Sequence, residues 1–358
     1  MRAAIRDCAA EVVQHGQRTV GSKCLALVWG LLDRPLVVEY GETMTSVARP
    51  IRIDAAFDDR EAVRSLFERN APYRAIAAYA PDGVVDDEIQ QETERPVLPW
   101  FRGDWAIAGK PLVPGAQMIL HNNKFLDAAR AIFGTSLIEP QMVVVNLNGP
   151  MPAGEPHVDI PTFRGATRLH YPLPFLKVMG ASGLFERWRV VQAGAVSWFY
   201  EGVGGTFDYW PDGLEGPMLS ERPPFGNVAI VSDSDRMYHR IGATGDPDST
   251  LPGMTAAAEI QPTLDRGWAI VEGGEVRKTY PAHSIRLSIV WKANVQDSEM
   301  TSDHLSLDRI METFQEDLRQ RRVDFRAPAN PLADVQWILL LQRCYSDQSV
   351  DLAREREL

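Results

Sequence analysis

Between residues 140 and 295 the sequence alternates short strand-forming segments with turns rich in glycine and proline. The segments that we expect to form strands are 142–147, 189–200, 227–231, 268–272 and 285–295. This spacing is typical of an all-β sandwich or barrel, because parallel βαβ units need a helix between successive strands. We therefore expect a mainly β protein with flanking helices (α+β), built around a jelly-roll, cupin-like core.

The segments on either side of this core show helical patterns. We predict three regions: a mixed helix/strand region (1–95) that packs on the core, the core itself (96–298) and a C-terminal helical extension (299–358). The expected helices are 3–13, 59–80, 124–133, 306–321 and 332–345, and two further strands are expected at 36–40 and 51–53. Residues 81–94 read as a loop and 242–265 as a turn-rich insertion. Residues 197–211 and 268–277 are each predicted to form a hairpin, the second through a Gly-Gly turn.

The charge and cysteine content exclude several classes of protein. Lys and Arg number 37 against 48 Asp and Glu, a net charge of −11, which argues against nucleic-acid binding. The three cysteines are widely spaced and form no CxxC pair, so neither a disulfide framework nor a thiolate zinc site is indicated. The apolar run 24–32 is too short to span a bilayer and lacks a cleavage site behind it, so we expect a cytoplasmic protein with no membrane contact.

One histidine and one aspartate, His157 and Asp159, lie two positions apart behind an apolar run. In an extended segment such residues point to the same face, so both could bind one metal ion. A second imidazole, His239, follows another apolar run, 227–231. Two histidines and one carboxylate that leave coordination positions open are the ligand set of non-haem Fe(II) oxygenases. The sequence therefore predicts an iron site made of these three side chains.

Two alternatives remain open for this site. The HxD spacing is common, and His157 could simply end a strand while Asp159 begins a turn before Pro161. His283 competes with His239 as the second imidazole. We favour His239, because a metal ligand and the arginine that serves the same site normally come from successive strands. His283 lies only three residues before that arginine, at the start of the same expected strand.

That arginine is Arg286. Strand alternation puts it on the same face as Ser288. If this face looks into a barrel, the guanidinium would be buried and would need an anion, which a carboxylate can supply through two hydrogen bonds. The dicarboxylate 2-oxoglutarate would fit, with its keto-acid end on iron and its far carboxylate on Arg286. An outward-facing Arg286 is the alternative, and Arg277 is a competing anchor that we expect to be exposed beside a hairpin turn.

Six short segments together resemble the Fe(II)/2-oxoglutarate-dependent oxygenases, near the phytanoyl-CoA hydroxylase-like group. The resemblance covers roughly residues 95–295. Its segments are Trp100-Phe101-Arg102-Gly103, Asn146-Leu147-Asn148-Gly149-Pro150, His157-Val158-Asp159-Ile160-Pro161-Thr162-Phe163-Arg164-Gly165, Ser182-Gly183-Leu184-Phe185, Tyr209-Trp210-Pro211-Asp212-Gly213 and Arg236-Met237-Tyr238-His239-Arg240.

The resemblance implies a double-stranded β-helix core with His157, Asp159 and His239 on iron. It also implies Arg286 and Ser288 on the co-substrate, and we add Asn146 from its second segment to the cofactor-binding residues. Arg286 lies 47 positions after His239, farther than in many such enzymes, so an insertion must separate them. The presence of Asp159 disfavours halogenation, because the related halogenases have a small residue there.

We therefore expect an enzyme that uses Fe(II), 2-oxoglutarate and O₂ to oxidise a small organic substrate, most simply by hydroxylation. A cupin-like metalloenzyme that needs no keto acid and a barrel that binds a ligand without catalysis are the alternatives. A homo-oligomer is compatible with the C-terminal helices, which could serve a dimer or a lid. A shared fold does not name the substrate.

Overall fold

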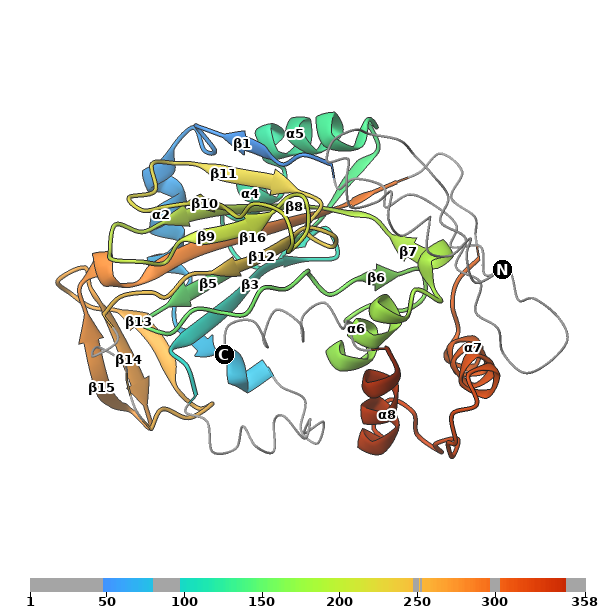
Figure 1. The fold of residues 1–358 in the computed structure, drawn as a ribbon. Coiled ribbons are helices and arrows are strands. Elements are labelled where there is room, and N and C mark those ends of the chain that lie inside the picture. Colours follow the sequence, from blue (N-terminus) through green and yellow to red (C-terminus); the bar gives the residue numbers. More distant parts are fainter. Residues whose placement is uncertain (1–47, 80–96, 247–250, 252, 297–302, 346–358) are drawn as a thin grey trace, which may run out of the picture. The chain divides into compact units, whose positions relative to one another are not determined.

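Antiparallel β-sheet is the main regular structure in the part of the chain that the computed structural model describes, which is residues 48–79, 97–246, 251, 253–296 and 303–345. The large sheet has eleven strands, in the order β1-β11-β8-β16-β5-β3-β2-β13-β14-β15 with β4 beside β3 (Figure 1). Its strands are β1 (Ile51–Ile53), β2 (Tyr73–Ala75), β3 (Trp100–Ile107), β4 (Lys110–Pro111), β5 (Ile138–Asn148), β8 (Gln192–Phe199), β11 (Ala229–Ser232), β13 (Glu259–Pro262), β14 (Trp268–Glu272), β15 (Glu275–Tyr280) and β16 (Arg286–Val295).

A smaller sheet packs against the inner face of the large one. It consists of β10 (Leu219–Glu221), β9 (Phe207–Trp210) and β12 (Tyr238–Ile241), in that order. An apolar cluster joins the two sheets and includes Trp198 of β8, Ile230 of β11 and Phe207 of β9. A third pair, β6 (Thr162–Phe163) with β7 (Arg189–Val190), lies apart from both.

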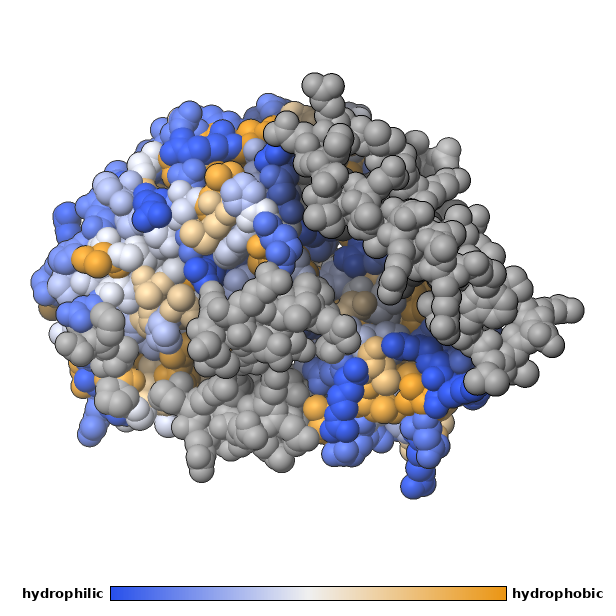
Figure 2. Space-filling view, viewed as in Figure 1, coloured by the Kyte–Doolittle hydropathy of each residue, from blue (hydrophilic) through white to orange (hydrophobic). Residues whose placement is uncertain are grey.

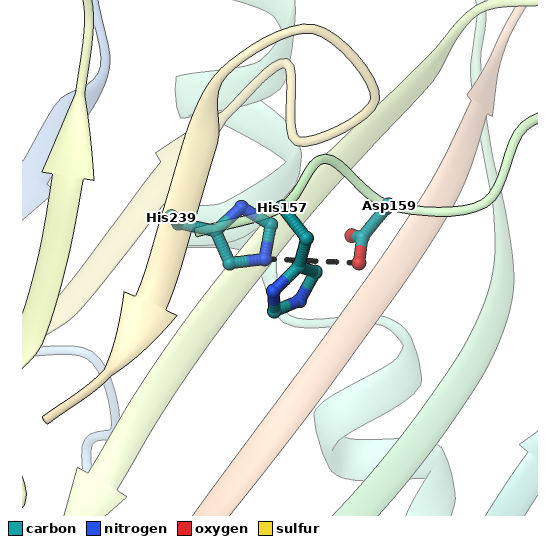
Figure 3. Close-up of side chains that lie close together, drawn as sticks. All are labelled: His157, Asp159 and His239. Atoms are coloured by element: carbon teal, nitrogen blue, oxygen red, sulfur yellow. Dashed lines mark ion pairs between the residues drawn. The ribbon is translucent and has the colours of Figure 1, made fainter. Parts of the chain in front are cut away.

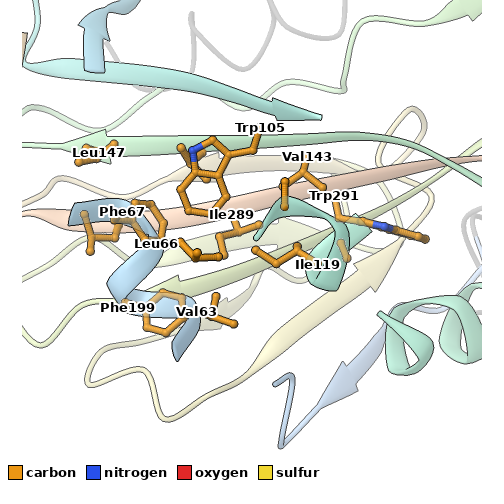
Figure 4. Close-up of a cluster of buried hydrophobic side chains, with 14 of the residues drawn as sticks. Val63, Leu66, Phe67, Trp105, Ile119, Val143, Leu147, Phe199, Ile289 and Trp291 are labelled. Carbon is orange, nitrogen blue, oxygen red and sulfur yellow. The ribbon is translucent and has the colours of Figure 1, made fainter. Parts of the chain in front are cut away.

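The outer face of the large sheet is covered by helices. Val63, Leu66 and Phe67 of α2 (Arg60–Arg69) pack there with α4 (Ala116–Leu120) and α5 (Asn123–Phe133) against residues of β3, β5, β8 and β16 (Figure 4). Local signals fix the helix ends: Asp59 accepts from the amide of Ala62, and α5 ends at Gly134 in the left-handed conformation. Short 3₁₀ segments lie at Ile76–Tyr79, Glu186–Trp188 and Ala282–Ser284.

Three further helices form a second apolar core. They are α6 (Leu173–Ser182), α7 (Leu307–Gln320) and α8 (Val335–Tyr345), and Phe175 and Phe314 lie buried where α6 and α7 meet. Figure 2 shows hydrophobic surface, bordered by hydrophilic residues, where α6 and α8 lie in Figure 1. None of the helices in the described ranges is long and apolar enough to cross a bilayer.

The five core strands that the sequence predicts are confirmed, and so are the 268–277 hairpin and the helices near 124–133, 306–321 and 332–345. Two predictions are wrong. The helix expected over 59–80 ends at Arg69, because Pro72 cannot continue a helix and the next residues form β2. Residues 197–211 form no hairpin, since β9 pairs with β10 and β12 rather than with β8.

The insertion expected between His239 and Arg286 contains more regular structure than a set of turns. It supplies β13, β14 and β15, which extend the large sheet beyond β2. The predicted helix 3–13, strand 36–40 and loop 81–94 lie outside the described residues. The three-region division of the chain stays a prediction.

Candidate metal centre

His157 and His239 lie directly opposite each other across an antiparallel bridge. The amide of His157 donates to the carbonyl of His239 over 3.0 Å, and the amide of His239 donates back over 2.9 Å. Their ring centroids are 4.7 Å apart. The bridge continues the small sheet beyond β12, so residues 82 positions apart in the sequence bring their imidazoles to one place.

Both imidazoles are oriented by backbone carbonyls. His157 Nδ1 lies 2.9 Å from the carbonyl oxygen of Glu155, and His239 Nδ1 lies 3.0 Å from that of Met237. A carbonyl oxygen can only accept, so Nδ1 carries a proton in each ring, and in the neutral ring Nε2 then has the free lone pair. This is the tautomer in which Nε2 can bind a metal.

Asp159 completes the group. Its Oδ1 lies 3.7 Å from His239 Nε2, and one ligand atom from each of His157, Asp159 and His239 lies within 4.8 Å of the other two (Figure 3). The Asp159 amide donates to the carbonyl of Ser234 over 2.9 Å, which ties this segment to the β11–β12 connection. His157 is exposed while the His239 side chain is only 12% exposed, so the group opens on one side.

A lysine that the sequence analysis did not identify holds the far side of the Asp159 carboxylate. Lys292 Nζ lies 2.9 Å from Asp159 Oδ2 and 2.9 Å from Asp235 Oδ1. Lys292 is 2% exposed and Asp235 6%. The alternation that pairs Arg286 with Ser288 also includes position 292, and this was the available signal.

These neighbours set the protonation states at the centre. Burial alone would raise the pKa of Asp159, but the Lys292 ammonium and then His239 outweigh it and hold that pKa below its usual range. Burial likewise opposes the charge on Lys292, yet Asp159 and Asp235 raise its pKa. The pKa of His239 is lowered, chiefly by burial, which favours the neutral imidazole that a metal needs.

Arg286 lies on the inner face of β16, as predicted, and is 1% exposed. Its Nε donates to the carbonyl of Gly205 over 2.8 Å, while its Nη2 finds no hydrogen-bond partner in the described part of the chain. Burial lowers its pKa to about 9, against a small opposing effect of Tyr200. Among the described residues Arg286 has no carboxylate partner, and a buried guanidinium without one is unfavourable, so this position fits a bound anion.

Ser288 and Asn146 lie beside this arginine. Ser288 is two residues from Arg286 on the same face of β16, and Asn146 is its cross-strand partner on β5. Both are buried, and Asn146 Oδ1 accepts from Trp100 Nε1 over 2.9 Å. Together with Arg286 they line one polar stretch of the inner sheet face.

The competing residues lie elsewhere. His283 sits in the 3₁₀ turn before β16, and the structure does not group it with His157 and Asp159. Arg277 is exposed on β15 and forms an ion pair with Glu272. The structure therefore brings His239 rather than His283 to the HxD pair, and it buries Arg286 rather than Arg277.

No protein-family model matches the chain, and no curated protein matches it. Among solved structures it is similar to a 2OG-Fe(II) oxygenase family oxidoreductase from Burkholderia pseudomallei (14% identity, TM-score 0.37, covering 68% of this chain and 84% of that one). It is also similar to a Pseudomonas putida prolyl-4-hydroxylase (12%, 0.34, covering 70% and 95%). A third similar structure is a non-heme alpha-ketoglutarate-dependent carbocyclase from nogalamycin biosynthesis (10%, 0.35, covering 73% and 90%).

Proposed function

We propose that this protein is an Fe(II)- and 2-oxoglutarate-dependent oxygenase that oxidises a small organic substrate, by hydroxylation as the default outcome. The observation that carries the proposal is the convergence of His157, Asp159 and His239, whose ligand atoms lie within 4.8 Å of one another. Two neutral imidazoles and one carboxylate, with one side open, suit ferrous iron and leave positions for a keto acid and O₂. Relation to the phytanoyl-CoA hydroxylase-like group is part of this proposal.

The strand order supports a double-stranded β-helix as the core. From β5 onwards the chain passes repeatedly between the two sheets. The large sheet takes β5, β8, β11 and β16. The small sheet takes the His157 bridge, β9, β10 and β12, which lie between those strands in the sequence. Such a jelly roll places side chains from both sheets around one interior. The centre draws His157 and His239 from the small sheet and faces β16 of the large one.

Arg286 supports 2-oxoglutarate as the co-substrate. Its buried Nη2 has no partner in the described residues, and a carboxylate would restore the missing hydrogen bond and charge. Ser288 and Asn146 would add hydrogen-bonding groups beside it. A dicarboxylate can bind this cation with one end and a metal with the other, whereas a monocarboxylate can satisfy only one of the two.

In the reaction, bound iron with 2-oxoglutarate and O₂ supplies the oxidation of a substrate C–H bond. The side chains of the metal group hold the ion from one side, and the Glu155 and Met237 carbonyls keep both imidazoles in the binding orientation. Arg286 orients the co-substrate by its far carboxylate. The cytoplasmic location, the absence of nucleic-acid and membrane contact, and a homo-oligomer stay predictions.

The direct test is the visible charge-transfer band that an Fe(II)–keto-acid complex gives. Anaerobic addition of Fe(II) and 2-oxoglutarate to the unmutated protein should produce the band, and His157→Ala should abolish it. His170→Ala, which changes an exposed histidine outside the centre, is the matched control and should retain it. When O₂ is added, the unmutated protein and His170→Ala should release succinate, and His157→Ala should not.

The outcomes separate the candidate functions. No band from the unmutated protein at saturating Fe(II) and 2-oxoglutarate would contradict the proposal. Metal binding without any response to 2-oxoglutarate would instead favour a cupin-like metalloenzyme. No binding of a transition metal would favour a barrel that holds a ligand without catalysis.

A further inference from the structure

Behind the metal group lie two further charged residues, Lys292 and Asp235, both of which are buried. Lys292 of β16 lies between two carboxylates, with its Nζ 2.9 Å from Asp159 Oδ2 and 2.9 Å from Asp235 Oδ1. The exposed fraction of the Lys292 side chain is only 3%, as is that of Asp235. This arrangement uses one oxygen of Asp159 and leaves Oδ1 towards His239 Nε2, at 3.7 Å.

We propose that Lys292 is a positioning residue that fixes how Asp159 binds the metal, and that Asp235 holds Lys292 in place for this task. The inference rests on the proposed metal site. Because Oδ2 is occupied by the ammonium, Asp159 offers a single oxygen, Oδ1, to the ion. The carboxylate is thereby a one-oxygen ligand, and the coordination position that a second oxygen would fill stays available.

A main-chain hydrogen bond holds the backbone of Asp159 as well. The Asp159 amide donates to the carbonyl of Ser234, the residue directly before Asp235. The β11–β12 connection therefore tethers Asp159 twice, once through the main chain and once through the Asp235–Lys292 pair. Residues that orient a metal ligand by such contacts affect metal binding strongly although they never touch the ion.

Stability alone does not explain this group. Burying Lys292 and Asp235 and partly burying Asp159 costs desolvation energy, and their mutual attraction offsets that cost only when the geometry is good. A well-packed apolar set of similar volume often stabilises a fold as much or more. Asp235 Oδ2 also has no hydrogen-bond partner in the described chain, so the group is not optimised for stability. Its specific effect is on the direction of the Asp159 oxygens.

The test uses Co(II) as a spectroscopic probe of the otherwise intact protein. Lys292→Met keeps the length of the side chain and removes the charge, while Lys292→Arg keeps a donor to both carboxylates. We expect Lys292→Met to weaken Co(II) binding by about 10–100-fold and to change the visible d–d spectrum of the bound ion. Lys292→Arg should restore most of the affinity. Lys177→Met, on the exposed side of α6, is the matched control and should change neither.

A second variant covers the case in which Lys292→Met does not fold. The double variant Lys292→Met/Asp235→Asn removes one positive and one negative charge together, and it should show the same loss of affinity and altered spectrum. Unchanged Co(II) affinity and spectrum in a folded variant that lacks the ammonium would overturn the inference. Failure of the unmutated protein to bind Co(II) or Fe(II) would overturn the proposed function instead, so the two failures are distinguishable.

Discussion

The main chains of His157 and His239 exchange two hydrogen bonds, each amide donating to the other residue's carbonyl over 3.0 and 2.9 Å. The two imidazoles are therefore placed by strand pairing rather than by side-chain packing alone. In such a pair, directly opposite side chains on one face lie close enough to share a ligand. The position of the second histidine is set by the register of the bridge.

Loss of His239 should remove metal binding, whereas loss of His283 should not. His239→Ala deletes a ligand atom within 4.8 Å of those of His157 and Asp159. We expect its Fe(II) affinity to fall by more than the roughly 10–100-fold that residues merely orienting a ligand cause. His283→Ala is the control, because this side chain lies in the turn before β16. Anaerobic Fe(II) titration measures both, and a His239→Ala protein that binds iron normally would contradict the ligand assignment.

Replacement of Arg286 should weaken 2-oxoglutarate binding and leave metal binding largely unchanged. Arg286→Gln removes the buried charge that faces the proposed far carboxylate, and loss of one partner from a buried charge pair costs about 2–5 kcal/mol, or at least about 30-fold in Kd. Titration of the Fe(II) protein with 2-oxoglutarate, followed by the visible band, gives the Kd. Arg277→Gln, which loses contacts to Glu272 and Gly253 away from the metal group, should bind as the unmutated protein does. Equal Kd values for both variants would exclude Arg286 as the anchor.

Ionisation of the buried Asp233 carboxyl should lower the free energy of unfolding as the pH rises. Burial, and then the charge of Asp235, raises its pKa from 3.8 to about 6. Between these values the folded state retains a proton that the unfolded chain has released, so the free energy of unfolding falls as the pH rises from about 4 to 6. The full effect is about 3 kcal/mol at most, at 1.36 kcal/mol for each pKa unit.

The variant Asp233→Asn removes this titration. We expect it to be more stable than the unmutated protein by about 1–3 kcal/mol at pH 7 and to match it at about pH 3, below both pKa values. Urea unfolding at several pH values measures the difference. A difference that does not change with pH would show that Asp233 is not the responsible group.

Two left-handed glycines should differ sharply in their tolerance of alanine. A Cβ on Gly165 (φ +89) would lie 2.3 Å from the carbonyl oxygen of Leu305, whereas a Cβ on Gly134 (φ +65) would meet nothing within 4 Å. Gly134→Ala should therefore cost only the backbone strain, about 1 kcal/mol. Gly165→Ala should cost about 3 kcal/mol or more, because main chain cannot move aside as a flexible side chain can. Urea unfolding compares them, and equal losses would contradict the predicted clash.

The residues of the metal group could be predicted because their signals are local. The HxD spacing, the apolar runs before both histidines and the alternation around Arg286 are all readable over a few positions. The sequence favoured His239 over His283 through the expectation that a metal ligand and the arginine come from successive strands, whereas the bridge that brings His239 to His157 is revealed by no local pattern. Burial of Arg286 likewise follows from the position of β16 between β5 and β8.

The remaining features depended on contacts between distant segments. Strand alternation places Lys292 on the face of Arg286, but its ion pairs could not be predicted, because a lysine in a strand usually faces solvent and its partners lie 57 and 133 positions away. The false hairpin at 197–211 has a similar origin. Gly204 and Gly205 both have positive φ, but they lie in the connection that leaves the large sheet for the small one rather than in a hairpin turn.

The side chains of β16 alternate between two environments: Arg286, Ser288 and Lys292 face the site, and Leu287, Ile289 and Trp291 pack under the helices. A slip of one residue in its pairing with β5 or β8 would exchange the two sets. It would place the Arg286 guanidinium and the Lys292 ammonium in the apolar core, and it would remove both from the face that holds Asp159. Because one strand carries both sets, the pairing of β16 with β5 and β8 fixes the apolar core and the polar site in a single step.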